Sequence, residues 1–156
     1  MVLVILGLAA VVVMLAFAFG SGSVEGQIQV RGKPFGTWSM KPTACYSGQH
    51  QSFFGVWVAP ELEKSGGREG FKGGIKVVKS HKEEWEAYLE SPLECESFKC
   101  KVTELPRAWC KVFEVDVRNT RNSINDIWVL EGSIRLDCSS PEGGAVTASL
   151  KFDGCH

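Results

Sequence analysis

Residues 127–152, IWVLEGSIRLDCSSPEGGAVTASLKF, form the most regular stretch of the chain. Two segments in it, 127–138 and 145–152, alternate apolar and polar side chains, which is typical of strands with one buried face. The residues between them, SSPEGG, are strong turn formers. The stretch therefore predicts a hairpin of two antiparallel strands whose apolar faces cover a core. The core-facing positions are Trp128, Leu130, Ile134, Leu136, Cys138, Val146, Ala148, Leu150 and Phe152.

The same alternation continues upstream of this hairpin. Residues 109–117 place Phe113, Val115 and Val117 against charged neighbours, and a polar turn region at 119–126 links them to the hairpin. A register slip of one residue would expose the apolar face, so the pairing of these strands is well specified. Further short strands are predicted at 24–30, 35–40, 53–59, 75–79 and 84–90. About eight short strands separated by turns predict an all-β domain, an antiparallel β-sandwich or a barrel.

The N-terminal segment, Met1–Gly20, carries no charged or polar side chain. A helix of ~20 apolar residues matches a hydrocarbon core of ~30 Å, so residues 1–20 are predicted to form one apolar helix, a transmembrane signal-anchor. A cleaved signal peptide is the alternative, because Ala16-Phe17-Ala18 offers an A-x-A cleavage site. The length of the segment favours the anchor. Residues 21–24 are then a short linker, and residues 25–156 an extracytoplasmic β-domain.

Six cysteines, an even number, lie outside the apolar segment: Cys45, Cys95, Cys100, Cys110, Cys138 and Cys155. In an exported chain an even set predicts disulfides formed in an oxidising compartment. Their spacing does not match a zinc site, so we expect neither a metal nor a cofactor. Strand parity places Cys138 on the core face and Cys110 on the outer face. We therefore expect no Cys110–Cys138 bridge. Cys110 would instead reach the loop of Cys95 and Cys100, and Cys138 would pair with Cys45 or Cys155.

The charge of the chain is nearly balanced, with a formal net charge of −1 at pH 7. A nucleic-acid-binding domain usually carries a basic patch, so nucleic acid is not an expected partner. The expected partners are the membrane, through residues 1–20 if they are not cleaved, and a protein or glycan ligand. The domain would lie in the periplasm or the extracellular space, and it would be secreted if the segment is removed.

Ser47 and His50 place a hydroxyl near an imidazole and are the candidate catalytic residues. A nucleophilic serine also needs an orienting group and an oxyanion hole, and the chain has no G-x-S-x-G motif. A polar loop beside a disulfide explains this pair more simply. We therefore expect a protein that is not an enzyme, with a small secreted hydrolase as an alternative.

Aromatic residues indicate a binding surface more strongly. The strand predicted at 53–59 is apolar on both faces, with Phe53 and Trp57 on one of them. If that face is exposed, Phe53, Trp57 and Trp38 would form a binding surface, since exposed aromatic rings stack on sugars or anchor protein partners. Packing in the core is the alternative. The remaining tryptophans on apolar faces are expected in the core: Trp85, Trp109 and Trp128.

Two pairs of short segments resemble small cysteine-containing proteins of the bacterial cell envelope. The first pair is CYSG at 45–48 followed by FGV at 54–56, and the second is GSIRLDC at 132–138 followed by FDGC at 152–155. The resemblance implies an envelope location, and it assigns no activity and no functional residue.

Together these features predict a membrane-tethered or secreted β-sandwich that serves as a binding or structural module of the cell envelope. The alternatives are a small secreted hydrolase and a secreted inhibitor that uses a disulfide-braced loop such as residues 95–100.

Overall fold

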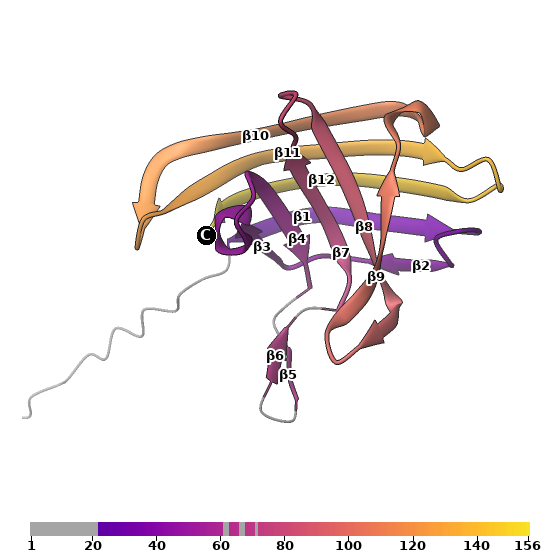
Figure 1. Cartoon of the computed structure of the whole chain (residues 1–156), viewed down its shortest axis with the longest axis horizontal. Helices are drawn as coiled ribbons and strands as arrows, with labels where there is room; N and C mark the ends of the chain where they lie inside the picture. The colour runs from indigo at the N-terminus through magenta and orange to yellow at the C-terminus, as the bar shows by residue number, and fades with distance from the viewer. Residues whose placement is uncertain (1–21, 61–62, 66–67, 71) are drawn as a thin grey trace, which may run out of the picture.

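Two antiparallel sheets of five strands each build the domain (Figure 1). The computed structural model describes residues 22–60, 63–65, 68–70 and 72–156. Within these ranges no helix is both long and apolar enough to cross a membrane, and the helix predicted at 1–20 lies outside them. The prediction of an all-β, sandwich-like fold is confirmed. The first strand begins at Ser23, inside the stretch assigned to the linker at 21–24.

The first sheet has the strand order β10-β11-β12-β1-β2, and the second has the order β3-β4-β7-β8-β9. In Figure 1 the strands of the second sheet run steeply across those of the first. The strands of the first sheet are β1 (Ser23–Arg31), β2 (Trp38–Met40), β10 (Cys110–Ile124), β11 (Ile127–Ser139) and β12 (Ala145–Cys155). Those of the second are β3 (Ala44–Ser47), β4 (Gly55–Ala59), β7 (Gly74–Lys79), β8 (Trp85–Glu96) and β9 (Lys99–Leu105). A separate ribbon consists of β5 (Glu63–Ser65) and β6 (Arg68–Gly70), and two short 3-10 helices are η1 (Gly48–Gln51) and η2 (Arg107–Trp109).

The hydrophobic core lies between the two sheets. β1 shows the underlying pattern, because Ile28 and Val30 are buried whereas the intervening Gln27 and Gln29 face solvent. Each large apolar side chain buried in this way stabilises the fold by ~1.5–3 kcal/mol. Both sheets contribute large buried side chains to one cluster, among them Phe35, Val56, Ile75, Leu89, Leu130 and Ile134.

The three consecutive strands predicted near the end of the chain are confirmed as β10, β11 and β12. Their apolar faces coincide across the ladder, since Val115 lies opposite Ile134 and Ile134 lies opposite Leu150. Leu136 is buried in the same face, opposite Phe113. The alternation in the sequence therefore fixed the register of this part of the sheet.

The prediction for Cys110 and Cys138 is wrong, because these two cysteines bridge each other. The three disulfides are Cys45–Cys155, Cys95–Cys100 and Cys110–Cys138. A β-bulge explains the error: Cys110 lies opposite Cys138, whereas Val112 lies opposite Asp137, so Lys111 is an extra residue in β10. The bulge reverses the alternation and places Cys110 against the core, on the same side as Phe113.

The hairpin of β10 and β11 extends beyond the core. Its turn, Asn125-Asp126, joins Ile124 to Ile127, and both turn residues have positive φ angles of 50° and 64°. Near this tip Trp128 is 41% exposed, so the prediction that it packs in the core is wrong. Trp128 has the parity of the buried Leu130, but its side chain lies where the core no longer covers that face. Trp85 and Trp109 are half-buried and pack against the core.

A disulfide joins the two sheets where the chain passes between them. β3 follows β2 in the chain but pairs with β4 in the second sheet. Cys45 in β3 is bridged to Cys155 at the end of β12, and both cysteines are fully buried. The bridge therefore holds the edge of one sheet against the other.

Candidate functional site

The two candidate catalytic residues lie in different surroundings. Ser47 has the parity of the buried Cys45 and is 2% exposed, and its hydroxyl has no hydrogen-bond partner among the described residues. His50 is exposed in η1, and its ring packs edge-on against His156 with ring centroids 5.3 Å apart. In the part of the chain that the structure describes, no hydrogen bond joins Ser47 to His50 or to a carboxylate. An enclosed hydroxyl of this kind has no activating base and no access to a substrate.

Two of the three aromatic residues considered for binding are buried. Trp38 and Trp57 are each 9% exposed. The indole N–H of Trp38 donates to the carbonyl of Phe35 at 3.2 Å, within the core. Trp57 lies opposite Lys76 in the sheet register, and the ammonium of Lys76 sits 4.3 Å from the centroid of its ring. Phe53 is half-buried and lines a cleft at the end of the second sheet.

This cleft, which we call the aromatic cleft, has a volume of about 790 Å³. Sites for small ligands usually have volumes of ~300–1,000 Å³. Two loops form the cleft: the segment between η1 and β4, and the turn between β7 and β8. Its lining residues are Ser52, Phe53, Phe54, Val78, Lys79, Ser80, His81, Glu83 and Glu86.

Backbone hydrogen bonds hold the two loops together. The amide of Lys79 donates to the carbonyl of Phe54 at 2.9 Å, which continues the pairing of β4 and β7. The turn closes because Glu83 N donates to Ser80 O at 3.0 Å. Glu83 has a φ of 62°, a left-handed conformation that glycine usually occupies and that costs other residues about 1 kcal/mol. The turn thus holds a carboxylate at the rim of the cleft, where it forms an ion pair with Lys79.

Phe54 provides an exposed aromatic surface in the cleft. Its side chain is 43% exposed, and its ring stacks on Trp85 with centroids 5.9 Å apart and planes inclined by 30°. The ammonium of Lys79 lies 5.9 Å from the Phe54 centroid. Because Trp85 supports the ring from one side, its other surface is held in place beside charged and hydroxyl groups.

Gly48 determines where Phe53 sits. Gly48 is buried, and a Cβ at this position would lie 2.3 Å from the Phe53 ring. The amide of Phe53 donates to the carbonyl of Gly48 at 3.1 Å, which closes the loop after η1. Ser52 has a φ of 63° and reverses the chain between them. The absence of a side chain at Gly48 therefore lets the ring form one wall of the cleft.

Tyr88 orients the second carboxylate of the cleft. The hydroxyl of Tyr88 donates to Oε2 of Glu86 at 2.7 Å. This hydrogen bond, assisted by burial and by the negative charges of Glu86 and Glu104, raises the pKa of Tyr88 to about 12. The phenol thus keeps its proton at neutral pH and fixes the Glu86 carboxylate at the edge of the cleft.

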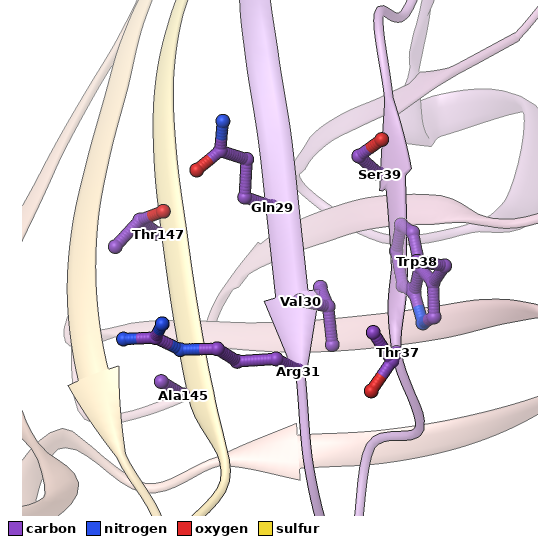
Figure 2. A pocket seen from close by; sticks show the side chains of 8 residues that line it. All are labelled: Gln29, Val30, Arg31, Thr37, Trp38, Ser39, Ala145 and Thr147. Atoms are coloured by element: carbon purple, nitrogen blue, oxygen red, sulfur yellow. The ribbon is translucent and has the colours of Figure 1, made fainter.

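A second hollow, which we call the polar groove, lies on the outer face of the first sheet (Figure 2). Its volume is about 430 Å³. It follows β1 where that strand runs between β12 and β2. Its lining residues are Gln29, Val30, Arg31, Thr37, Trp38, Ser39, Ala145 and Thr147.

The hairpin of β8 and β9 forms an arm that continues beyond the second sheet (Figure 1). β7 pairs with β8 only as far as Glu90, and the residues that follow pair with β9 alone. Cys95 lies opposite Cys100 and is bridged to it, just before the tight turn at Ser97-Phe98. On this arm Leu93 is 62% exposed.

Sequence patterns did not identify two residues on which these sites depend. Phe54 shares the parity of the buried Val56 and Val58, but it precedes the first residue of β4 and its side chain is exposed. Its position next to Gly55, at the start of the strand, was the available signal. Arg31 lay in a stretch that reads as a turn, yet it ends β1 and reaches into the polar groove.

The described residues contain no group of three or more His, Cys, Asp or Glu side chains that could hold a metal ion. No protein-family model matches the chain, and no curated protein or solved structure is significantly similar to it.

Proposed function

We propose that this chain is an extracytoplasmic binding module that holds a carbohydrate in the aromatic cleft. Its three disulfides indicate an oxidising environment outside the cytoplasm. The apolar residues 1–20 support attachment of the domain to a membrane. In this proposal the cleft is the ligand site, and the remainder of the sandwich is the scaffold that holds its two loops.

The observation that carries the proposal is the exposed ring of Phe54, supported by Trp85 and surrounded by polar groups. A pyranose ring has one face of C–H groups and a rim of hydroxyls. The C–H face is weakly positive and is attracted to the negative face of an aromatic ring. The rim needs donors and acceptors, which Ser52, Lys79 and Glu86 offer in the same cleft.

The composition of the cleft fits this ligand class better than the alternatives. A strongly apolar ligand would exclude water from Lys79, Glu83 and Glu86, and their ion pair and hydrogen bond do not satisfy all of their donors and acceptors, so the exclusion of water costs free energy. A protein partner usually covers a flat surface, whereas this site is a hollow between two loops. The left-handed conformation of Glu83 adds to the argument, because strained residues often occur at functional sites.

Carbohydrate binding can be tested with the full-length, oxidised chain in a polyoxyethylene detergent that carries no sugar. The protein is applied to an array of neutral and amino-sugar oligosaccharides. Each oligosaccharide that binds is then titrated into the protein by calorimetry. Phe54→Ala should raise the Kd about tenfold, equivalent to ~1.4 kcal/mol, because it removes the stacking surface. Phe54→Trp should retain binding.

Ile124→Ala provides a matched control. Ile124 is 42% exposed, close to the 43% of Phe54, but it lies at the tip of the β10–β11 hairpin. Its removal should leave the Kd unchanged. The proposal is wrong if no oligosaccharide on the array binds, or if Phe54→Ala binds as tightly as the unmodified protein.

The disulfide-braced arm supports a second candidate function, inhibition of a secreted protease. A hairpin held in one conformation loses little entropy on docking, which favours tight binding. The arm is clamped by Cys95–Cys100 and exposes Leu93. Residual activity of a panel of extracellular proteases, measured with and without the protein, tests this function. An inhibition that persists unchanged after Cys95→Ser and Cys100→Ser would show that the braced arm is not its cause.

A further inference from the structure

The polar groove differs from the aromatic cleft in its chemistry and in its place on the fold. It lies on the outer face of the first sheet, over β12, β1 and β2. Val30 and Trp38 border it, but their side chains are buried, so the groups available to a ligand come from the outward-facing residues between them. These are hydroxyls, one amide and one guanidinium, and none of the described residues that line the groove carries a carboxylate.

Arg31 differs from two other basic residues on this face of the sheet, Lys111 and Arg135. Lys111 pairs with Asp137 at 2.9 Å, and Arg135 pairs with Glu114 at 3.3 Å. These pairs connect neighbouring strands and neutralise each cation. For Arg31, by contrast, no carboxylate of the described residues lies within 4.0 Å. A guanidinium is always charged at physiological pH, so the groove carries an uncompensated positive charge.

The residues nearest Arg31 in the register are small or neutral. Arg31 lies opposite Ala145, whereas Gln29 lies opposite Thr147 on β12 and opposite Ser39 on β2. Figure 2 shows Arg31 and Gln29 both extending from β1 toward β12, with Ala145 and Thr147 on that strand. The short side chain of Ala145 leaves the groove open beneath the guanidinium.

The groove offers hydrogen-bond donors in excess of acceptors. The guanidinium of Arg31 has five N–H donors in a planar fork, and the amide of Gln29 has two. Thr37 Oγ1 accepts a hydrogen bond from the amide of Gly32 at 3.2 Å, so its own proton can be donated outward. Ser39 and Thr147 add two further hydroxyls. Donors around one cation are suited to an oxyanion, which is an acceptor only.

We propose that the polar groove binds the oxyanion of a small ligand, a carboxylate, sulfate or phosphate group, through a two-point contact with Arg31. Gln29 and Thr147 hydrogen-bond either the same group or hydroxyls next to it. The volume of about 430 Å³ suits a ligand of one or two sugar rings in size. This site is independent of the aromatic cleft, because it lies on the other sheet and shares no residue with it.

The side-chain Nε–H resonance of Arg31 reports on the contact directly. Full-length, oxidised protein is labelled with ¹⁵N-arginine in a polyoxyethylene detergent and titrated with sodium glucuronate, sodium sulfate, and sodium chloride as an ionic-strength control. The Arg31 resonance should shift in a saturable manner with glucuronate and sulfate, and not with chloride. Equal affinity for both anions identifies a site for an oxyanion from any source, and at least tenfold tighter binding of glucuronate identifies a site for acidic sugars.

Three variants in the groove and one control variant separate the proposed contact from general electrostatics. Arg31→Gln should raise the Kd by at least tenfold, and Arg31→Lys should weaken binding because it keeps the charge but loses the fork. Ala145→Leu should block binding by filling the groove without a change of charge. Arg135→Gln removes a paired arginine from the same face and should leave the Kd unchanged.

The proposal is overturned if no resonance of Arg31 shifts saturably. It is also overturned if Arg31→Gln binds as the unmodified protein does, or if Arg135→Gln loses binding to the same extent. Phe54→Ala should not affect this titration, so failure of the aromatic cleft and failure of the polar groove are distinguishable.

Discussion

Loss of the Cys45–Cys155 disulfide should destabilise the domain far more than loss of Cys95–Cys100. The two bridges close loops with sequence separations of 110 and 5 residues. The chain entropy that each bridge removes from the unfolded state corresponds to ~4.8 kcal/mol for the long loop and ~2 kcal/mol for the short one. Cys110–Cys138, with a separation of 28, lies between them at ~3.6 kcal/mol.

Two structural features modify these values. The other bridges lie inside the loop from Cys45 to Cys155 and shorten it, which lowers its contribution to ~4.5 kcal/mol. Cys45 and Cys155 are fully buried, so replacement of both by alanine also leaves a small void, at a further cost of ~1 kcal/mol. We therefore expect a loss of about 5–6 kcal/mol, which is a large part of the 5–15 kcal/mol that stabilises a typical domain.

The assay compares three double variants, each with one cysteine pair replaced by alanine. The oxidised full-length proteins are unfolded with guanidinium chloride in the same detergent, and tryptophan fluorescence gives the free energy of unfolding. The expected order of destabilisation follows loop length, with the 45–155 variant the least stable and the 95–100 variant losing only ~2 kcal/mol. The slope against denaturant should rise most for the 45–155 variant, since its unfolded state becomes more expanded.

Two results would refute this reasoning. If the 45–155 variant lost less than about 2 kcal/mol, the bridge would not be closing a long loop in an otherwise flexible unfolded chain. If the 95–100 variant lost as much as the 45–155 variant, the arm of β8 and β9 would be part of the cooperative core rather than an extension beyond it.

Further predictions concern residues at the aromatic cleft and in the core. Gly48→Ala should cost about 1–3 kcal/mol in thermal unfolding and weaken ligand binding, because its Cβ displaces the ring of Phe53; an unchanged melting temperature contradicts this packing. Tyr88 should ionise near pH 12 in an ultraviolet titration, and Glu86→Gln should return its pKa toward 10.0. Because its folded pKa is raised, the domain should lose stability as the pH rises from about 10 to about 12, and a gain there would oppose the assignment. Ser47→Ala should stabilise the domain by ~1 kcal/mol, since it removes a buried hydroxyl without a partner; a hydrolytic activity lost in this variant would revive the hydrolase alternative.

The alternation of apolar and polar residues predicted the strands best where one face of the strand is buried and the other is exposed to solvent. The central parts of β10, β11 and β12 meet that condition, so the faces of these segments follow from alternation, whereas the register shifts near their ends do not. β4 does not, because all five of its residues are buried and its sequence cannot distinguish one face from the other. The strands β3 and β9 were not predicted. β3 is short and β9 is rich in charged residues, so neither shows a clear alternation of apolar and polar residues.

The errors arose where a local irregularity overrode the period. The bulge at Lys111 reversed the parity of Cys110 and produced a wrong disulfide assignment. Trp128 has the parity of a core residue, but it is exposed because the β10–β11 hairpin extends beyond the core. Phe54 is exposed for the same reason, since it lies just beyond the end of β4. Periodicity reports which face a residue is on, whereas exposure depends on how far the opposing layer extends.

The position of β12 in the first sheet determines when that sheet can finish folding. β1 is synthesised early, but it lies between β2 and β12, and its long ladder is made with the late strand β12. Neither this ladder nor the Cys45–Cys155 bond can form until residues 145–155 have left the ribosome. The strands of the second sheet lie between residues 44 and 105, so all of them are available before β12 is made, and the first sheet with its disulfide to β3 can be completed only after the second.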